Sequence, residues 1–193
     1  MKRICVFCGS RFGNNSVYRA AATDLGKLLA EKELALVYGG GNVGLMGEIA
    51  NSVLAHGGKA TGVIPQFLVE KELVHEKLSE VRIVQSMHER KALMAELADG
   101  FIAMPGGFGT LEETVEVLTW AQLGLHRKPI GLLNIEGYFN ALYEFFEHMV
   151  KENFLHTEYK EMILIKDNAA EMMDSLVSFR LPDIDKWGDL DKI

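Results

Sequence analysis

Residues 104–113 combine a glycine-rich turn with two adjacent carboxylates and read Met-Pro-Gly-Gly-Phe-Gly-Thr-Leu-Glu-Glu. The apolar run 100–104 before the turn has the length and composition of a buried strand, and residues 111–123 after it carry apolar side chains at helical spacing. Glycine lets a ligand approach the backbone closely, and the free N–H groups at a helix start favour an anion. The stretch therefore predicts a phosphate cradle with a carboxylate attached.

A purely structural role is the alternative for the same residues. Thr110 and Glu113 have the spacing of a capping box, in which each side chain satisfies a backbone amide at the start of a helix. The repeated glycines argue against this role alone, because a cap needs one glycine or none. Both interpretations remain open at this point, and both predict a helix that starts near residue 111.

Composition and charge limit the class of protein. The chain has 193 residues, 48% hydrophobic and 24% charged, which predicts one globular domain over residues 1–180 and an acidic tail over residues 181–193. No apolar run approaches the roughly 18 residues that span a membrane, and residues 1–6 contain no signal cleavage site, so a cytoplasmic protein is expected. The net charge of −7 disfavours nucleic acid as a partner.

The two cysteines, Cys5 and Cys8, form a C-x-x-C pair, for which a redox role is an alternative. A redox pair is expected at a helix start, whereas these residues fall in a continuous apolar stretch that predicts a strand. They have no histidine nearby, and the chain contains no His-x-x-x-His pattern. We therefore expect neither a metal nor any other cofactor.

Apolar strands alternate with amphipathic helices along the chain, which predicts an α/β fold: a doubly wound, Rossmann-like parallel sheet with helices on both faces. The expected strands lie near residues 3–8, 34–38, 60–64, 81–85, 100–104, 129–133 and 162–166. The expected helices lie near residues 16–32, 44–56, 87–98, 111–123, 137–151 and 168–179. Residues 66–80 form a longer connection that could contain a short helix.

Three expected strands end in glycine-bearing turns, and ligands of such sheets lie at these strand ends. The turns span residues 8–10, 39–44 and 105–110, and they make Ser10, Gly40 and Gly41 candidate ligand contacts. The second turn matches G-x-G-x-x-G, a weak signal for a dinucleotide. The next strand, residues 60–64, has no acidic residue at its end to hold a ribose, so a mononucleotide is favoured over NAD.

A cationic cluster opens the helix expected at residues 87–98. Arg90 and Lys91 are adjacent in its first turn, and Ser86 is a candidate N-cap. Cations oppose the helix dipole at this end, so an anion at the neighbouring strand end would explain them. A solvated helix face is the alternative.

Met87-His88-x-Arg90-Lys91 followed by Pro105-Gly106-Gly107-x-Gly109-Thr110-x-x-Glu113 resembles the LOG (Lonely Guy) family, whose members were often labelled lysine decarboxylases. The similarity extends from the turn at residues 8–10 through Tyr38-Gly39-Gly40-Gly41-x-x-Gly44-Leu45-Met46-Gly47 to Trp120-Ala121-Gln122-Leu123-Gly124. The resemblance implies a homodimer that hydrolyses the N-glycosidic bond of a nucleoside 5′-monophosphate and releases free base and ribose 5-phosphate. In members that make cytokinins, the base is an N6-substituted adenine.

The resemblance also assigns residues to the site. Arg90 and Glu113 match the catalytic residues of the family. Substrate contacts are implied for Glu72, Lys91, Gly106, Gly107, Phe108, Gly109, Thr110, Leu111, Glu112 and Thr119. Phe108 stands where plant members commonly carry tyrosine, and Glu72 lies in the variable connection.

The reaction suits these residue types. Breaking the bond to the base builds positive charge on the sugar, which a carboxylate such as Glu113 stabilises while it activates water. Arg90 keeps its proton near neutrality, so we assign it to orienting and charge balance. On the expected helix, Glu112, Glu116 and Thr119 share one face, and Glu113 lies on the next, so the adjacent glutamates must point differently.

Two other functions stay open. The chain could bind or sense a nucleotide without hydrolysing it. A pyridoxal phosphate decarboxylase would need a Schiff-base lysine, for which Lys91 is the candidate in the cluster. The residues leave the base open, between adenine, an N6-modified adenine and another purine.

Overall fold

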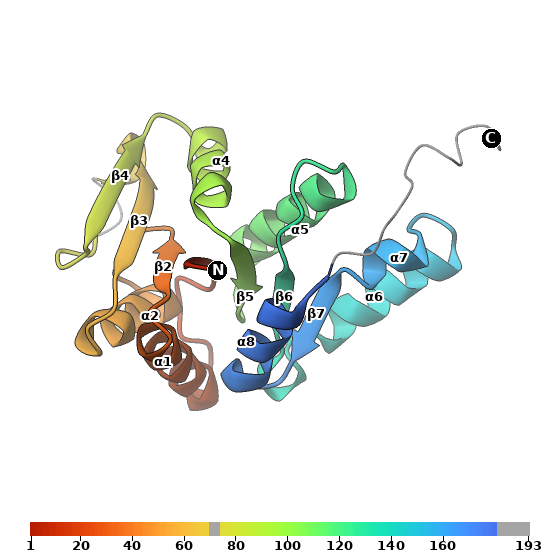
Figure 1. The fold of residues 1–193 in the computed structure, drawn as a ribbon, viewed down its shortest axis with the longest axis horizontal. Coiled ribbons are helices and arrows are strands. Elements are labelled where there is room, and N and C mark those ends of the chain that lie inside the picture. The colour runs from red at the N-terminus through yellow and green to blue at the C-terminus, as the bar shows by residue number, and fades with distance from the viewer. Residues whose placement is uncertain (70–73, 181–193) are drawn as a thin grey trace.

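A computed structural model describes residues 1–69 and 74–180 and contains a single seven-stranded parallel sheet (Figure 1). The strand order is β4-β3-β2-β1-β5-β6-β7. The strands span β1 Arg3–Phe7, β2 Ala35–Tyr38, β3 Ala60–Pro65, β4 Glu80–Val84, β5 Gly100–Ala103, β6 Ile130–Leu133 and β7 Ile163–Lys166. All seven strands were expected from the apolar runs, and the doubly wound α/β fold is confirmed.

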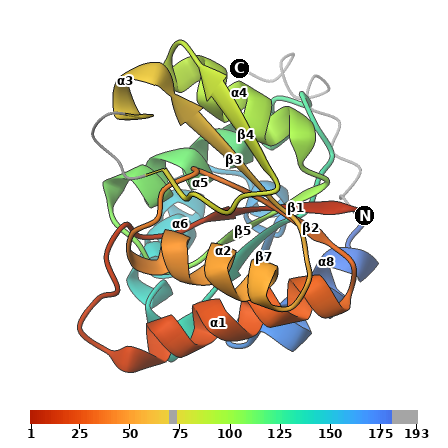
Figure 2. The same cartoon turned by 90° about the vertical axis from the view of Figure 1, so that its left-hand side faces the viewer.

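Helices cover both faces of the sheet (Figures 1 and 2). On one face, α1 and α2 pack on β2 while α8 packs on β6 and β7, and together they bury residues such as Leu29, Ile49 and Met172. On the other face, α4, α5 and α6 contribute Met94, Val117 and Phe146. The helices span α1 Ser16–Glu31, α2 Gly44–Ala55, α3 Gln66–Val69, α4 Met87–Leu97, α5 Phe108–Gln122, α6 Asn140–Lys151, α7 Thr157–Lys160 and α8 Ala169–Ser178.

The differences from the sequence prediction lie at element ends and in short elements. Helix α5 begins at Phe108 rather than near residue 111, and α6 begins at Asn140 after a 3-10 turn at Ile135–Gly137. The short helix considered for residues 66–80 is α3, whereas α7 was not expected. The tail at 181–193 lies outside the described residues. Helix α7 and the 3-10 turn were missed because one turn of helix leaves too little periodicity to detect.

The winding of the sheet reverses between β1 and β5, which lie side by side. The loops that follow these two strands are joined by a hydrogen bond of 3.0 Å from Gly9 N to Pro105 O. The start of α2 packs against the loop that follows β1, since a Cβ on Gly44 would overlap the backbone of Ser10. Ligands of doubly wound sheets bind at this reversal.

Within the described ranges, no helix is long and apolar enough to cross a bilayer.

Candidate active site

Arg90 is held at the carboxyl ends of β2 and β3. Ser86 caps α4 by accepting from Glu89 N at 3.1 Å, which places Arg90 in the first turn of the helix. The buried guanidinium donates from Nε to Val63 O at 3.1 Å and from Nη2 to Gly39 O at 3.2 Å. A side chain on Gly39 would overlap Nη2 and displace the guanidinium from this position. The two carbonyls explain why a cation is buried at a helix start.

The start of α5 is open towards a cavity. Its N-cap is Gly107, and no side chain of the described residues caps it. The first backbone hydrogen bond of the helix runs from Leu111 N to Gly107 O at 3.1 Å. The amides of Phe108, Gly109 and Thr110 come before it and therefore have no acceptor within the helix. The capping box is therefore wrong, because the helix starts at Phe108 and Thr110 already lies within its first turn.

A cavity of about 260 Å³ brings together Arg90, Glu113 and the open helix start. A Cβ on Gly107 or Gly109 would have no other atom within 4 Å, so the backbone at both glycines borders open space. The cavity is lined by Cys8, Gly9, Ser10, Met46, Arg90, Gly107, Phe108, Gly109, Thr110 and Glu113. The uncapped start of α5 and the side chains of Arg90 and Glu113 thus face one space.

Burial dominates the ionisation of Glu113. It raises the pKa of the carboxyl, the positive charge of Arg90 opposes the rise, and the result is a pKa of about 7. A carboxyl with this pKa changes its charge close to neutral pH. Such a group is suited to proton transfer and to charge stabilisation in the same cavity.

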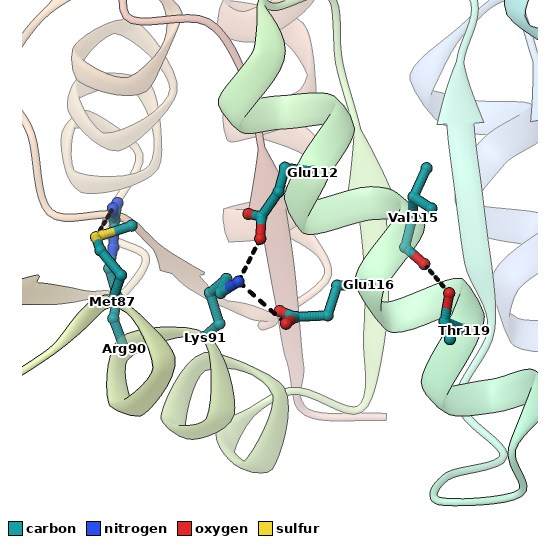
Figure 3. A network of polar contacts seen from close by, with 7 residues as sticks. All are labelled: Met87, Arg90, Lys91, Glu112, Val115, Glu116 and Thr119. Atoms are coloured by element: carbon teal, nitrogen blue, oxygen red, sulfur yellow. Dashed lines mark hydrogen bonds and ion pairs between the residues drawn. The ribbon is translucent and has the colours of Figure 1, made fainter.

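Lys91 does not line this cavity, and its side chain extends from α4 towards Glu112 and Glu116 of α5 (Figure 3). Its buried ammonium donates to Glu112 and, at 3.0 Å, to Glu116. Burial alone would lower the pKa of Lys91, but the hydrogen bonds to the two carboxylates outweigh it and raise the pKa. The expectation that Glu112 and Glu113 point differently is confirmed, since Glu112 pairs with Lys91 while Glu113 lines the cavity.

The predicted glycines at positions 106, 40 and 41 do not line the Arg90–Glu113 cavity. Gly106 lines a neighbouring cavity of about 300 Å³ that shares Gly9, Ser10 and Gly107 with the first. Gly40 has φ +81° and its carbonyl accepts from His75 N at 3.1 Å, and Gly41 forms an isolated bridge with Val74.

The structure does not bring Leu111 or Thr119 to the Arg90–Glu113 cavity. Leu111 packs in the core cluster with α6, and Thr119 lines an apolar groove further along α5. The hydroxyl of Thr119 donates to Val115 O at 2.8 Å (Figure 3). Glu72 lies outside the described residues.

The two cysteines belong to different sides of the sheet. Cys5 packs in the cluster with α4 and α5, and Cys8 in the cluster with α1 and α2. Both thiols are free, and burial raises both pKa values. This environment disfavours the thiolate that redox chemistry requires.

In the part of the chain that the structure describes, no three His, Cys, Asp or Glu side chains are grouped to hold a metal ion.

Sequence reasoning missed Met46 as a lining residue and gave no role to Glu116 beyond its helix face. Met46 lies in the first turn of α2, two residues after Gly44, and its place in the cavity depends on how α2 packs on the loop after β1. Glu116 stands one turn after Glu112, which was the available signal.

The fold and the site define a Rossmann-like α/β protein in which an uncapped helix start, a carboxyl and a guanidinium line one cavity at the reversal of the sheet. The family model described as "Possible lysine decarboxylase" matches residues 46–176. This chain therefore belongs to that family, the LOG family.

Relatives with assigned names span most of the chain. Cytokinin riboside 5′-monophosphate phosphoribohydrolase LOG7 of Arabidopsis thaliana is 48% identical over 100% of this chain and 91% of its own length. Probable cytokinin riboside 5′-monophosphate phosphoribohydrolase LOGL3 of Oryza sativa subsp. japonica is 50% identical over 92% and 84%. A Moco carrier protein of Chlamydomonas reinhardtii shares the fold, with a TM-score of 0.70 at 19% identity over 91% of this chain and 95% of that protein.

Proposed function

We propose that this protein is a phosphoribohydrolase that converts a nucleoside 5′-monophosphate and water into the free base and ribose 5-phosphate. AMP and N6-substituted AMP are the proposed substrates, in line with the names of the plant relatives. The observation that carries the proposal is the single cavity that joins an uncapped helix start to Arg90 and Glu113.

The 5′-phosphate binds at the start of α5. The free amides of Phe108, Gly109 and Thr110 and the positive end of the helix dipole provide donors for its oxygens. Ser10 extends the same wall from the loop after β1. Because this anchor lies away from the bond that breaks, its binding energy serves to position the ribose.

Glu113 acts on the sugar. The bond between C1′ and the base breaks with its electrons leaving on the base, and the ionised carboxylate stabilises the positive charge on the ribose. The same carboxylate accepts a proton from the water whose oxygen bonds to C1′, and the leaving base takes up one proton, so that it departs as the neutral free base. Arg90 keeps its charge, and its fixed guanidinium orients the substrate and balances the carboxylate.

A comparison of phosphorylated and unphosphorylated substrates tests the anchor. We expect AMP and N6-isopentenyl-AMP to release base with a kcat/KM at least about 10³-fold above that of adenosine and N6-isopentenyladenosine, because the nucleosides lack the anchored group. Equal rates for nucleosides and monophosphates would contradict the phosphate site. Tight nucleotide binding without release of base would favour the alternative, a nucleotide sensor.

The pKa of Glu113 predicts how the rate depends on pH. The carboxylate is the active form, so kcat/KM should fall by half near pH 7 and continue to fall tenfold per pH unit below it. The second ionisation of a phosphate monoester, near pH 6, would add a separate step at lower pH. Measurement between pH 5 and 9 checks this, and a flat profile between pH 6 and 8 would contradict the role of Glu113.

We further infer a homodimer that covers the apolar groove between α5, α6 and α7. The groove has a volume of about 330 Å³, and Phe154 and Phe145 on it are 87% and 52% exposed. Exposed apolar patches of this kind mark association surfaces, and burial of aromatic side chains dominates interface energies. A second copy is the proposed occupant because the family resemblance implies a homodimer, and Thr119, a residue with an implied substrate contact, lines the groove.

Phe154→Asp should convert the dimer into a monomer, because a carboxylate would have to be buried against the second copy. Light scattering should give twice the chain mass of 21.5 kDa for the wild type and 21.5 kDa for the variant. Phe67→Asp is the matched control, since Phe67 is 51% exposed on α3, outside the groove. A dimeric Phe154→Asp protein would place the interface elsewhere.

A further inference from the structure

Helices α4 and α5 are joined by a three-residue ionic bridge (Figure 3). Lys91, on α4, is the buried centre of the bridge and pairs with Glu112 and Glu116, one turn apart on α5. The two carboxylates differ in exposure: the side chain of Glu116 is 25% exposed and that of Glu112 is 54% exposed. Glu116 is therefore the less solvated of the two acceptors.

The two oxygens of Glu116 have different surroundings. Oε1 accepts from Lys91 Nζ at 3.0 Å, whereas Oε2 is buried and finds no partner among the residues the structure describes. Leaving a buried acceptor unpaired costs free energy. Lys91 is therefore the partner that the structure shows for this carboxylate, and the pair links α4 to α5 at this point.

The bridge is next in sequence to both charged residues of the cavity. Arg90 precedes Lys91 on α4, and Glu113 follows Glu112 on α5. Successive residues of a helix differ by about 100° in direction, so one face of each helix can form the bridge while the next face lines the cavity. A shift of α4 against α5 at the bridge would change the distance between the Arg90 guanidinium and the Glu113 carboxylate.

The bridge also contributes to the electrostatic field at Glu113. The charged and titratable groups that act with Glu113 are Arg90 and Lys91 from α4, Glu112 and Glu116 from α5, and Cys5 and Cys8 from β1 and its end. Arg90 and Lys91 lower the pKa of the Glu113 carboxyl, whereas Glu112 and Glu116 raise it. Removing the charge of Glu116 takes away one raising influence and leaves Lys91 less neutralised. Both changes lower the pKa of Glu113.

We propose that Glu116 is a positioning residue of the site: through Lys91 it sets α4 against α5, and so sets the geometry of the Arg90–Glu113 pair. The proposal rests on the phosphoribohydrolase function proposed above. Glu116 does not line the Arg90–Glu113 cavity and needs no contact with the substrate in this role.

Two variants separate the effect of the Glu116 charge from the effect of its side-chain length. Glu116→Gln removes the charge, so kcat should fall about 10-fold and the acid limb of kcat/KM should move to lower pH by about half a unit or more. Glu116→Asp keeps the charge on a side chain one methylene shorter. Its kcat should fall similarly, while its acid limb should stay at the wild-type pH.

The measurement is base release from AMP or N6-isopentenyl-AMP between pH 5 and 9, with thermal unfolding of each protein recorded in parallel. Glu147→Gln is the control, because Glu147 pairs with Lys160 at 3.1 Å across α6 and α7, away from the cavity; it should match the wild type in rate and acid limb. A role in stability alone would lower the unfolding temperature of the Glu116 variants without moving the acid limb.

Each outcome decides one hypothesis. An unmoved acid limb in a folded Glu116→Gln protein would overturn the positioning role. If Glu116→Gln does not fold, Glu116→Asp decides, and a wild-type kcat in that variant would overturn the proposal. If the wild-type protein itself releases no base from any monophosphate, the proposed function fails, which is distinct from a failure at Glu116.

Discussion

Glu113→Gln should leave a folded protein that binds nucleoside monophosphates and hydrolyses them about 10³-fold more slowly than the wild type. Glutamine keeps nearly the same shape but can neither balance positive charge on the ribose nor accept a proton from water. The helix start does not depend on this side chain, since the N-cap of α5 is Gly107. Rates should be measured under saturating AMP, with nucleotide affinity determined separately by calorimetry.

Stability distinguishes this loss from unfolding. Burial raises the pKa of Glu113 from 4.5 to about 7 in the folded protein, so the folded state binds the proton more tightly and loses stability as pH rises through this interval. Above pH 7, Gln removes the buried charge, and the unfolding temperature at pH 8 should be equal to or above that of the wild type. Glu31→Gln, at the exposed end of α1, should change neither rate nor affinity. Near-wild-type turnover in Glu113→Gln would refute the catalytic assignment.

Arg90→Lys should lower kcat/KM by about 10²–10³-fold although the positive charge is retained. The guanidinium reaches Val63 O and Gly39 O with two different nitrogens. A lysine ammonium is a single point on a flexible stem and cannot hold both carbonyls while facing the cavity. The unpaired carbonyl should also cost about 1–3 kcal/mol of unfolding free energy.

The matched control is Arg82→Lys. Arg82 lies on the edge strand β4 and pairs with Glu80 at 2.6 Å, with its side chain 53% exposed. Its replacement should leave both kcat/KM and the unfolding free energy near wild type, because an exposed pair contributes little. A wild-type rate in Arg90→Lys would show that only the charge at position 90 matters and that the two hydrogen bonds of the guanidinium do not.

The sheet could be predicted because its strands are short apolar runs bounded by turns. Residues 100–104 and 129–133, for example, are buried on both faces of a parallel sheet, which leaves an almost unbroken apolar signal. The start of α5 was placed too late because Phe108 is flanked by glycines, which are typical of loops. In the structure Gly107 caps the helix and Gly109 lies in its first turn, where open glycine backbone borders the cavity.

The candidate site was predicted in part. The residue types and their place at strand ends gave Arg90, Glu113 and the glycine turn, and the structure brings these together. The pairing of Lys91 with Glu116 depends on how α4 packs on α5, and no local pattern encodes that contact. Thr119 illustrates the same limit, since the face of α5 that it occupies borders α6 rather than the cavity.

The central claim is that this cavity hydrolyses a nucleoside monophosphate rather than only binding it. The most direct measurement incubates the protein with N6-isopentenyl-AMP in a buffer free of phosphate and quantifies free base and ribose 5-phosphate in the same samples over time. The account predicts that both products accumulate in equal amounts over many turnovers. Saturable binding of the nucleotide with neither product formed would contradict it.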